Sequence, residues 1–254
     1  MKKALLCVSF GTSVAAARES ITAVEQVLRD TAADREFARA FTSPTIRRIL
    51  TKRGEEIHSV AEALQQLLEE GFTDVLVQPT HILYGYEYDK MREELISWRE
   101  KFQVLTLGQP LLAGTEDIKR LAAVMAELYP AEENGITVLF GHGTEHFANA
   151  TYPALQMAFH LMGREDLLVG TVEGWPAFED VAAQLAASGR KKVRLVPAML
   201  VAGDHAMNDM AGEDEDSWKS RLEALGYEVS CTMQGMGMLK PVQEMYRHRL
   251  EKLL

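Results

Sequence analysis

The sequence predicts an α/β protein made of two similar, doubly wound lobes, each with a parallel sheet, and a cleft between them. Two observations lead to this prediction. Short apolar runs typical of strands alternate with longer amphipathic stretches typical of helices along all 254 residues, which is the pattern of βαβ units. This series of four strand–helix units also occurs twice, separated by a polar segment at 129–135 that contains Pro, Asn and Gly. We therefore expect lobes at residues 1–130 and 135–254.

Each expected strand is a run of roughly four to eight mainly apolar residues that ends at turn-forming or polar residues. The expected strands are Ala4–Ser9, Phe37–Phe41, Asp74–Gln78, Gln103–Leu107, Ile136–Phe140, Leu167–Val172, Lys192–Val196 and Glu228–Thr232. Amphipathic stretches between them predict helices at Ala15–Thr31, Thr45–Lys52, Val60–Glu70, Asp89–Lys101, Glu116–Leu128, Tyr152–Met162, Ala177–Ala187, Ser217–Leu225 and Pro241–Leu254. Several of these helices are followed directly by glycine, the usual helix terminator.

Composition excludes several functional classes. The formal net charge is −10, which argues against nonspecific binding to nucleic acid or to anionic membranes, because both are polyanions. The two cysteines, Cys7 and Cys231, cannot form a disulfide framework, so we expect a reducing, cytoplasmic location. No apolar run reaches the length of about 18 residues that a membrane span needs. The first apolar run, Ala4–Phe10, has the pattern of a strand and lacks that of a signal peptide.

Three chemically active residues follow successive strands of the second lobe. His142 follows the first strand, Glu173 the second, and His205 lies after the third. With a 2-1-3 strand order these three ends would be neighbours, because adjacent strands lie about 4.8 Å apart. Two imidazoles and a carboxylate suit a borderline divalent ion such as Co²⁺, Ni²⁺, Fe²⁺ or Zn²⁺. Three protein ligands would leave positions open, as a site that exchanges its metal requires.

Other interpretations of these residues stay open. Either histidine can be a hydrogen-bonded structural residue, and Glu173 can cap the helix that begins near Pro176. His146, four residues after His142, is an alternative ligand or proton partner. In the first lobe, the turn Phe10-Gly11-Thr12-Ser13 lacks nucleotide-binding motifs but suits a carboxylate. A basic group at Arg47, Arg48, Lys52 and Arg53 is either an exposed helix face or an anion site.

Several distinctive stretches extend along nearly the whole chain. They are Ser9-Phe10-Gly11-Thr12-Ser13, Arg39-Ala40-Phe41-Thr42-Ser43, His81-Ile82 with Gly85 and Glu87-Tyr88, Gly141-His142-Gly143, Val172-Glu173, and Met199–Ala206 with Asn208-Asp209-Met210. Together they resemble the anaerobic cobalt chelatases of the CbiK type, which have a ferrochelatase-like pair of α/β lobes. Members of that family insert Co²⁺ into sirohydrochlorin on the way to cobalamin. The sequence departs from the family pattern at Glu145-His146-Phe147 and at Trp175.

The resemblance implies a tetrapyrrole chelatase of the lyase class that needs neither ATP nor an organic cofactor. Co²⁺ would be the substrate metal, held by His142, Glu173 and His205, with His142 also accepting a pyrrole proton. Sirohydrochlorin would lie in the cleft. The residues expected to contact it are Thr12, Ser13, Arg53, His81, Glu87 and Met199. The residues leave open two other functions: an iron or nickel chelatase, or a metal or tetrapyrrole carrier without turnover. A homo-oligomer is also open.

Overall fold

The structure is a computed structural model that describes residues 1–254 and contains two four-stranded parallel sheets. The first sheet consists of β1 (Lys3–Ser9), β2 (Glu36–Phe41), β3 (Asp74–Pro79) and β4 (Val104–Leu107), in the order β2-β1-β3-β4. The second consists of β5 (Gly135–Gly141), β6 (Leu167–Thr171), β7 (Lys192–Pro197) and β8 (Glu228–Cys231), in the order β6-β5-β7-β8. The predictions of two parallel sheets and of a 2-1-3 strand order are confirmed.

Nine α-helices accompany the strands: eight lie between strands along the chain, and α9 follows the last strand. They are α1 (Ala15–Thr31), α2 (Pro44–Lys52), α3 (Val60–Glu69), α4 (Tyr86–Ile96), α5 (Thr115–Leu128), α6 (Thr151–Leu161), α7 (Phe178–Ser188), α8 (Trp218–Ala224) and α9 (Lys240–Glu251). Short 3₁₀ turns occur at Arg99–Lys101, Phe147–Ala150 and Met236–Met238, and a π-helical turn at Ala206–Met210. No helix combines the length and the apolar character that crossing a membrane would need.

The helix predicted at 89–101 differs in the structure. It begins earlier, at Tyr86, and ends at Ile96, before a separate 3₁₀ turn. The helix ends early because of Ser97, whose hydroxyl donates to the carbonyl of Glu94 at 2.8 Å. Such local side-chain bonds compete with the continuation of a helix. Trp98 is then buried against the apolar core of the first sheet.

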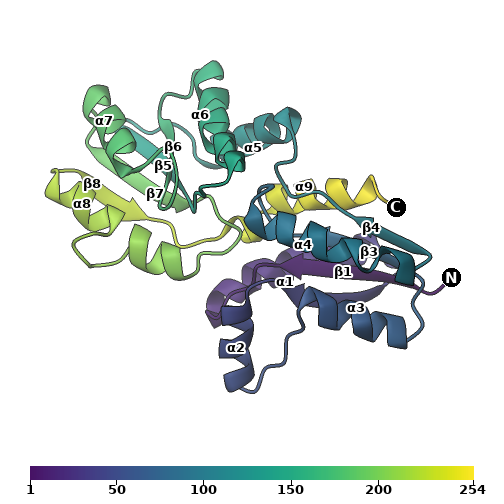
Figure 1. The fold of residues 1–254 in the computed structure, drawn as a ribbon. Coiled ribbons are helices and arrows are strands. Elements are labelled where there is room, and N and C mark those ends of the chain that lie inside the picture. Colours follow the sequence, from purple (N-terminus) through teal and green to yellow (C-terminus); the bar gives the residue numbers. More distant parts are fainter. The chain divides into compact units, whose positions relative to one another are not determined.

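The chain forms two compact units, Met1–Ala113 with Gly237–Leu254, and Gly114–Met236. The boundary that the sequence suggested, at 130–135, therefore falls inside the second unit. Helix α9 belongs to the first unit (Figure 1), where its residues contact α1 and where Tyr246 donates to the carbonyl of Thr80 at 2.6 Å. Helix α5 belongs to the second unit, where Arg164 donates to the carbonyl of Ala126 at 2.6 Å.

Both sheets are covered by helices on their two faces. In the first unit, alternate residues of β1 (Ala4, Leu6 and Val8) pack with α3 and α4, as the period of two in a strand requires. In the second unit, Ile136 and Phe140 of β5 pack with α7, α8 and the π-helical turn. This cover leaves the loops at the carboxyl ends of the strands, where ligands bind in parallel sheets.

The hydroxyl of Tyr246 holds α9 on the first unit, which gives a test of its packing. Tyr246 is completely buried, and its hydroxyl forms its hydrogen bond with the carbonyl of Thr80. We expect Tyr246→Phe to lower the free energy of unfolding by about 1–3 kcal/mol, because the buried carbonyl of Thr80 loses its donor. The matched change in a more exposed residue, Tyr227→Phe, should cost less than about 0.5 kcal/mol. Urea denaturation measures both, and equal midpoints for the two variants would contradict this packing.

Candidate metal centre

The loops after β5 and β6 are joined through their backbones. The register of the two strands places Gly141 beside Thr171, and the pairing continues past the strands, where Glu173 N donates to the carbonyl of His142 at 2.8 Å. His142 and Glu173 therefore lie side by side at the carboxyl edge of the sheet. They hold these positions because the central strand β5 is fixed between β6 and β7.

Small residues let these two loops touch. Gly143 has a φ of 82°, and a Cβ at this position would lie 2.4 Å from the backbone nitrogen of Gly174. Asn149 ties the loops together, because it accepts from Thr144 N at 3.1 Å and donates to the carbonyl of Trp175 at 2.6 Å. The hydroxyl of the buried Tyr152 accepts from Gly143 N at 3.3 Å. The backbone around His142 and Glu173 is thus held from several directions.

His205 reaches the same place from the loop after β7. It directly precedes the π-helical turn, whose Ala206 and Met210 are both completely buried in the core of the second unit. These two anchors fix the turn, and His205 stays partly exposed beside it. Its ring centroid lies 4.5 Å from that of His142, and the two rings are nearly perpendicular, at 86°.

The three predicted ligands form one cluster in the structure. His142, Glu173 and His205 each offer one ligand atom, and these atoms all lie within 4.8 Å of one another. Oε2 of Glu173 also lies 3.7 Å from Nδ1 of His142. The side chains are 45%, 57% and 35% exposed, respectively, so a bound ion would keep solvent-accessible positions. A set of two nitrogens and one oxygen can hold a borderline divalent ion.

Of the residues expected to contact the tetrapyrrole, only Met199 shares the second unit with this cluster. It packs against the core there, and its carbonyl accepts from Met236 N at 2.8 Å. The other five lie in the first unit: Thr12, Ser13, Arg53, His81 and Glu87. Arg53 donates to the carbonyl of Ser13 at 2.5 Å, so these two are brought together. The hydroxyl of Thr12 accepts from Val14 N at 3.2 Å and is buried.

His81 and Glu87 differ in their surroundings. Both ring nitrogens of His81 are buried without a hydrogen-bond partner, although part of the residue reaches the surface. Burial lowers the pKa of His81 to about 4, and the nearby carboxylate of Glu87 opposes this shift only in part. His81 is therefore neutral at physiological pH and offers no positive charge to a carboxylate. Glu87 lies in the first turn of α4, where Lys90 pairs with it at 3.0 Å.

The first unit repeats the backbone of this centre without its ligands. Ser43 N donates to the carbonyl of Phe10 at 3.2 Å, as Glu173 N does to His142, and Gly11 has a φ of 99°, as Gly143 has 82°. Phe10 and Ser43 therefore occupy the places of His142 and Glu173. Neither an aromatic hydrocarbon ring nor a hydroxyl replaces an imidazole or a carboxylate as a ligand for such an ion. The candidate ligand set thus occurs on only one of two similar backbones.

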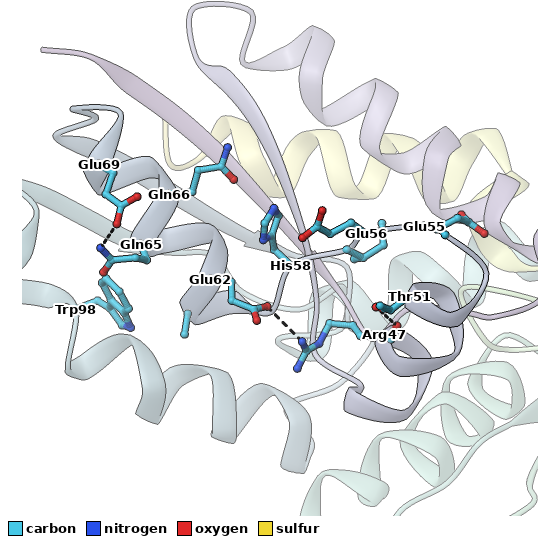
Figure 2. A pocket seen from close by; sticks show the side chains of 13 residues that line it. Arg47, Thr51, Glu55, Glu56, His58, Glu62, Gln65, Gln66, Glu69 and Trp98 are labelled. Atoms are coloured by element: carbon cyan, nitrogen blue, oxygen red, sulfur yellow. Dashed lines mark hydrogen bonds and ion pairs between the residues drawn. The ribbon is translucent and has the colours of Figure 1, made fainter.

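A separate hollow of about 910 Å³ lies in the first unit, between α2, α3 and the segment that connects them. Figure 2 shows its polar lining, in which Arg47 and Glu62 form an ion pair at 3.3 Å. Arg47 belongs to the basic group seen in the sequence, and this pairing engages its charge. None of the predicted ligands or substrate contacts lines the hollow.

Comparison with known proteins identifies the fold and then the family. A solved structure of SirB from Bacillus subtilis with Fe³⁺ has the same fold, with a TM-score of 0.68 and 17% identity over 99% of this chain and 95% of that one. The sequence profile of the family "Cobalt chelatase (CbiK)" matches residues 3–254. The chain belongs to this cobalt chelatase family.

Two curated relatives agree with that assignment. The chain is 40% identical to a sirohydrochlorin cobaltochelatase of Salmonella typhimurium, over 100% of this chain and 97% of the relative. It is 35% identical to the sirohydrochlorin cobaltochelatase CbiKC of Nitratidesulfovibrio vulgaris, over 92% of this chain and 84% of the relative. The prediction of the family is therefore confirmed.

Sequence reasoning missed two residues that shape the centre. Asn149 joins the two loops, and Asp209 forms a hydrogen bond with His205 Nδ1 at 2.6 Å. The spacing of four residues between His205 and Asp209 was the available signal, because such residues share one face of a helical turn. No comparable signal marks Asn149, which depends on a contact across the sheet edge.

Gly143 gives a direct test of the contact between the loops. We expect Gly143→Ala to weaken Co²⁺ binding and to destabilise the protein by more than the roughly 1–2 kcal/mol cost of a positive φ, because the added Cβ collides with the backbone of Gly174. Gly163→Ala is the matched control, since Gly163 has a φ of 71° but nothing within 4 Å of its Cβ position. Isothermal titration and thermal melting measure both effects. Equal Co²⁺ affinity in the two variants would show that this contact does not shape the centre.

Proposed function

We propose that this protein inserts Co²⁺ into sirohydrochlorin and that His142, Glu173 and His205 hold the ion before its transfer. Membership of the cobalt chelatase family supports the reaction. The main support for the metal site is the cluster itself. Loops after three neighbouring strands of one sheet bring ligand atoms of two imidazoles and a carboxylate within 4.8 Å of one another. The substrates are a divalent metal ion and a planar tetrapyrrole.

The reaction balances without another reactant. Co²⁺ leaves its protein ligands and binds the four ring nitrogens, while two pyrrole N–H bonds break and two protons depart. No electron is transferred, and no ATP is needed to complete this balance. The protein's tasks are therefore to deliver the ion with few ligands attached, to hold the macrocycle and to accept protons.

The cluster suits delivery better than storage. Its three ligands are all partly exposed, so an incoming ring nitrogen can take an open position on the ion. The protein ligands can then leave one at a time. A closed set of four ligands would retain the ion, as structural zinc sites do.

His142 is placed to accept a proton after it releases the metal. Its Nδ1 lies 2.9 Å from the carbonyl of Gly143, and a carbonyl only accepts, so Nδ1 carries the hydrogen and Nε2 the free electron pair. The electron pair that binds Co²⁺ becomes available to a pyrrole proton when the ion moves to the macrocycle.

The negative substrate must be held locally. A chain with a net charge of −10 does not attract a polycarboxylate as a whole. Arg53, Ser13 and Thr12 are the proposed carboxylate contacts, supported by the bond between Arg53 and the Ser13 carbonyl. His81, Glu87 and Met199 stay proposed contacts, with His81 acting as a neutral side chain. A cytoplasmic location stays a prediction from the cysteine content.

Turnover by His142 variants separates an enzyme from a carrier. We expect His142→Ala to lower the rate of Co²⁺ insertion by about 100-fold or more, because it removes both a ligand and a proton acceptor. The control is His160→Ala, since His160 lies at the end of α6 and pairs with Glu165 at 2.6 Å. Absorbance of the tetrapyrrole follows the reaction. Binding of one equivalent without further turnover by the unaltered protein would contradict the enzyme proposal and favour a carrier.

The identity of the metal needs a separate comparison. The donor set accepts Fe²⁺ and Ni²⁺ as well as Co²⁺, so selectivity depends on the rate of transfer. We expect the highest kcat/KM for Co²⁺ when the three free ions are buffered at equal concentrations under anaerobic conditions. A higher value for Fe²⁺ or Ni²⁺ would assign the protein to another metal.

A further inference from the structure

Asp209 is hydrogen bonded to one of the proposed ligands and has no role in the reaction described so far. Its Oδ2 lies 2.6 Å from Nδ1 of His205, which stands four residues earlier. Both side chains are partly exposed, at 35% for His205 and 42% for Asp209. The pair is therefore at the surface of the candidate centre.

The backbone between the two residues holds them in this arrangement. The turn is π-helical, with Ala211 N donating to the carbonyl of Ala206 at 3.2 Å. Ala206 and Met210 are completely buried and four residues apart, and His205 and Asp209 have the same spacing one residue earlier. At Gly212 a Cβ would lie 2.3 Å from the carbonyl oxygen of Asn208, so only glycine closes the turn without displacement. π-Helical turns of this kind are frequent at functional sites.

The bond determines which nitrogen of His205 can bind a metal. An ionised carboxylate only accepts hydrogen bonds, so Nδ1 carries the hydrogen and Nε2 keeps its electron pair. Asp209 lies at the Nδ1 side of the ring, away from Nε2, and is therefore not a ligand of the same ion while this bond exists. His142 is oriented in the same way by the carbonyl of Gly143. Both imidazoles thus present Nε2.

We propose that Asp209 is a positioning residue that holds His205 in the tautomer and orientation needed to bind the substrate metal through Nε2. This inference rests on the proposed metal site. Carboxylates in this position are known to increase metal affinity, because they orient the imidazole and raise its basicity. The role differs from that of the three ligands, since Asp209 acts only through His205.

The same turn contains a suitable control. Asn208 donates to Asp204 at 3.0 Å, again over four residues, and this second pair does not involve the imidazole. A change that merely loosens the turn should have similar effects at Asp204 and at Asp209. A positioning role should affect metal binding only at Asp209.

The experiment is a Co²⁺ titration of the full chain, followed by the visible absorption of the bound ion, with thermal melting in parallel. We expect Asp209→Ala to weaken Co²⁺ binding about 10–100-fold and to change the absorption spectrum. Asp209→Asn should recover part of this loss, because its amide oxygen still accepts from Nδ1. Asp204→Ala should bind Co²⁺ as the unaltered protein does. Unchanged affinity in Asp209→Ala, equal losses at Asp204 and Asp209, or no recovery in Asp209→Asn would overturn the proposal.

His205→Ala in the same titration tests the proposed metal site separately from the proposed role of Asp209. If His205→Ala binds Co²⁺ as tightly as the unaltered protein, the proposed metal site is wrong and Asp209 has no ligand to position. If His205→Ala loses affinity while Asp209→Ala does not, the site stands and only the role of Asp209 is wrong. Loss in both, with normal binding by Asp204→Ala, supports both.

Discussion

The parallel pairing of β5 with β6 on one side and β7 on the other is the constraint on which the centre depends. Because all three strands point the same way, their carboxyl ends meet at one edge, and the residues after them become neighbours despite wide separation in sequence. The backbone bond from Glu173 N to the His142 carbonyl extends this pairing into the loops. Backbone hydrogen bonds therefore set the spacing of His142 and Glu173, whereas the buried Ala206 and Met210 place His205.

The two units show how little of the backbone is specific to the chemistry. Each has a 2-1-3 core, a glycine with positive φ after its first strand, and a hydrogen bond between the first two loops. The proposed ligands occur in the second unit, whereas Phe10 and Ser43 fill the equivalent places in the first. Function here lies in a few side chains on a repeated frame, as is general for folds of this kind. The first unit's own chemistry is different: a neutral His81 whose ring nitrogens are buried, and a group formed by Arg53 with Ser13.

Much of this arrangement could be predicted from the sequence, and particular residues show why the rest could not. Strand ends are local features, so His142 and Glu173 were found from the apolar runs that precede them. The end of α4 depends on a Ser97 side-chain bond that periodicity does not reveal. The predicted lobes placed α5 in the first lobe and α9 in the second, whereas the structure assigns them the other way round. This assignment depends on tertiary contacts such as that of Tyr246 with Thr80. The only sign of Asp209 in the sequence is that it lies four residues after His205. Its contact with His205 depends on a π-helical turn that the sequence pattern does not predict.

We have proposed that one divalent ion binds between His142, Glu173 and His205. Crystals of the Co²⁺-loaded protein, with anomalous data collected at the cobalt edge, test this most directly. We expect an anomalous peak at about 2.0–2.2 Å from Nε2 of both histidines and from a carboxylate oxygen of Glu173. A peak coordinated by Nδ1, or cobalt found elsewhere, such as at the glutamates of the hollow in Figure 2, with none between these three residues, would contradict it.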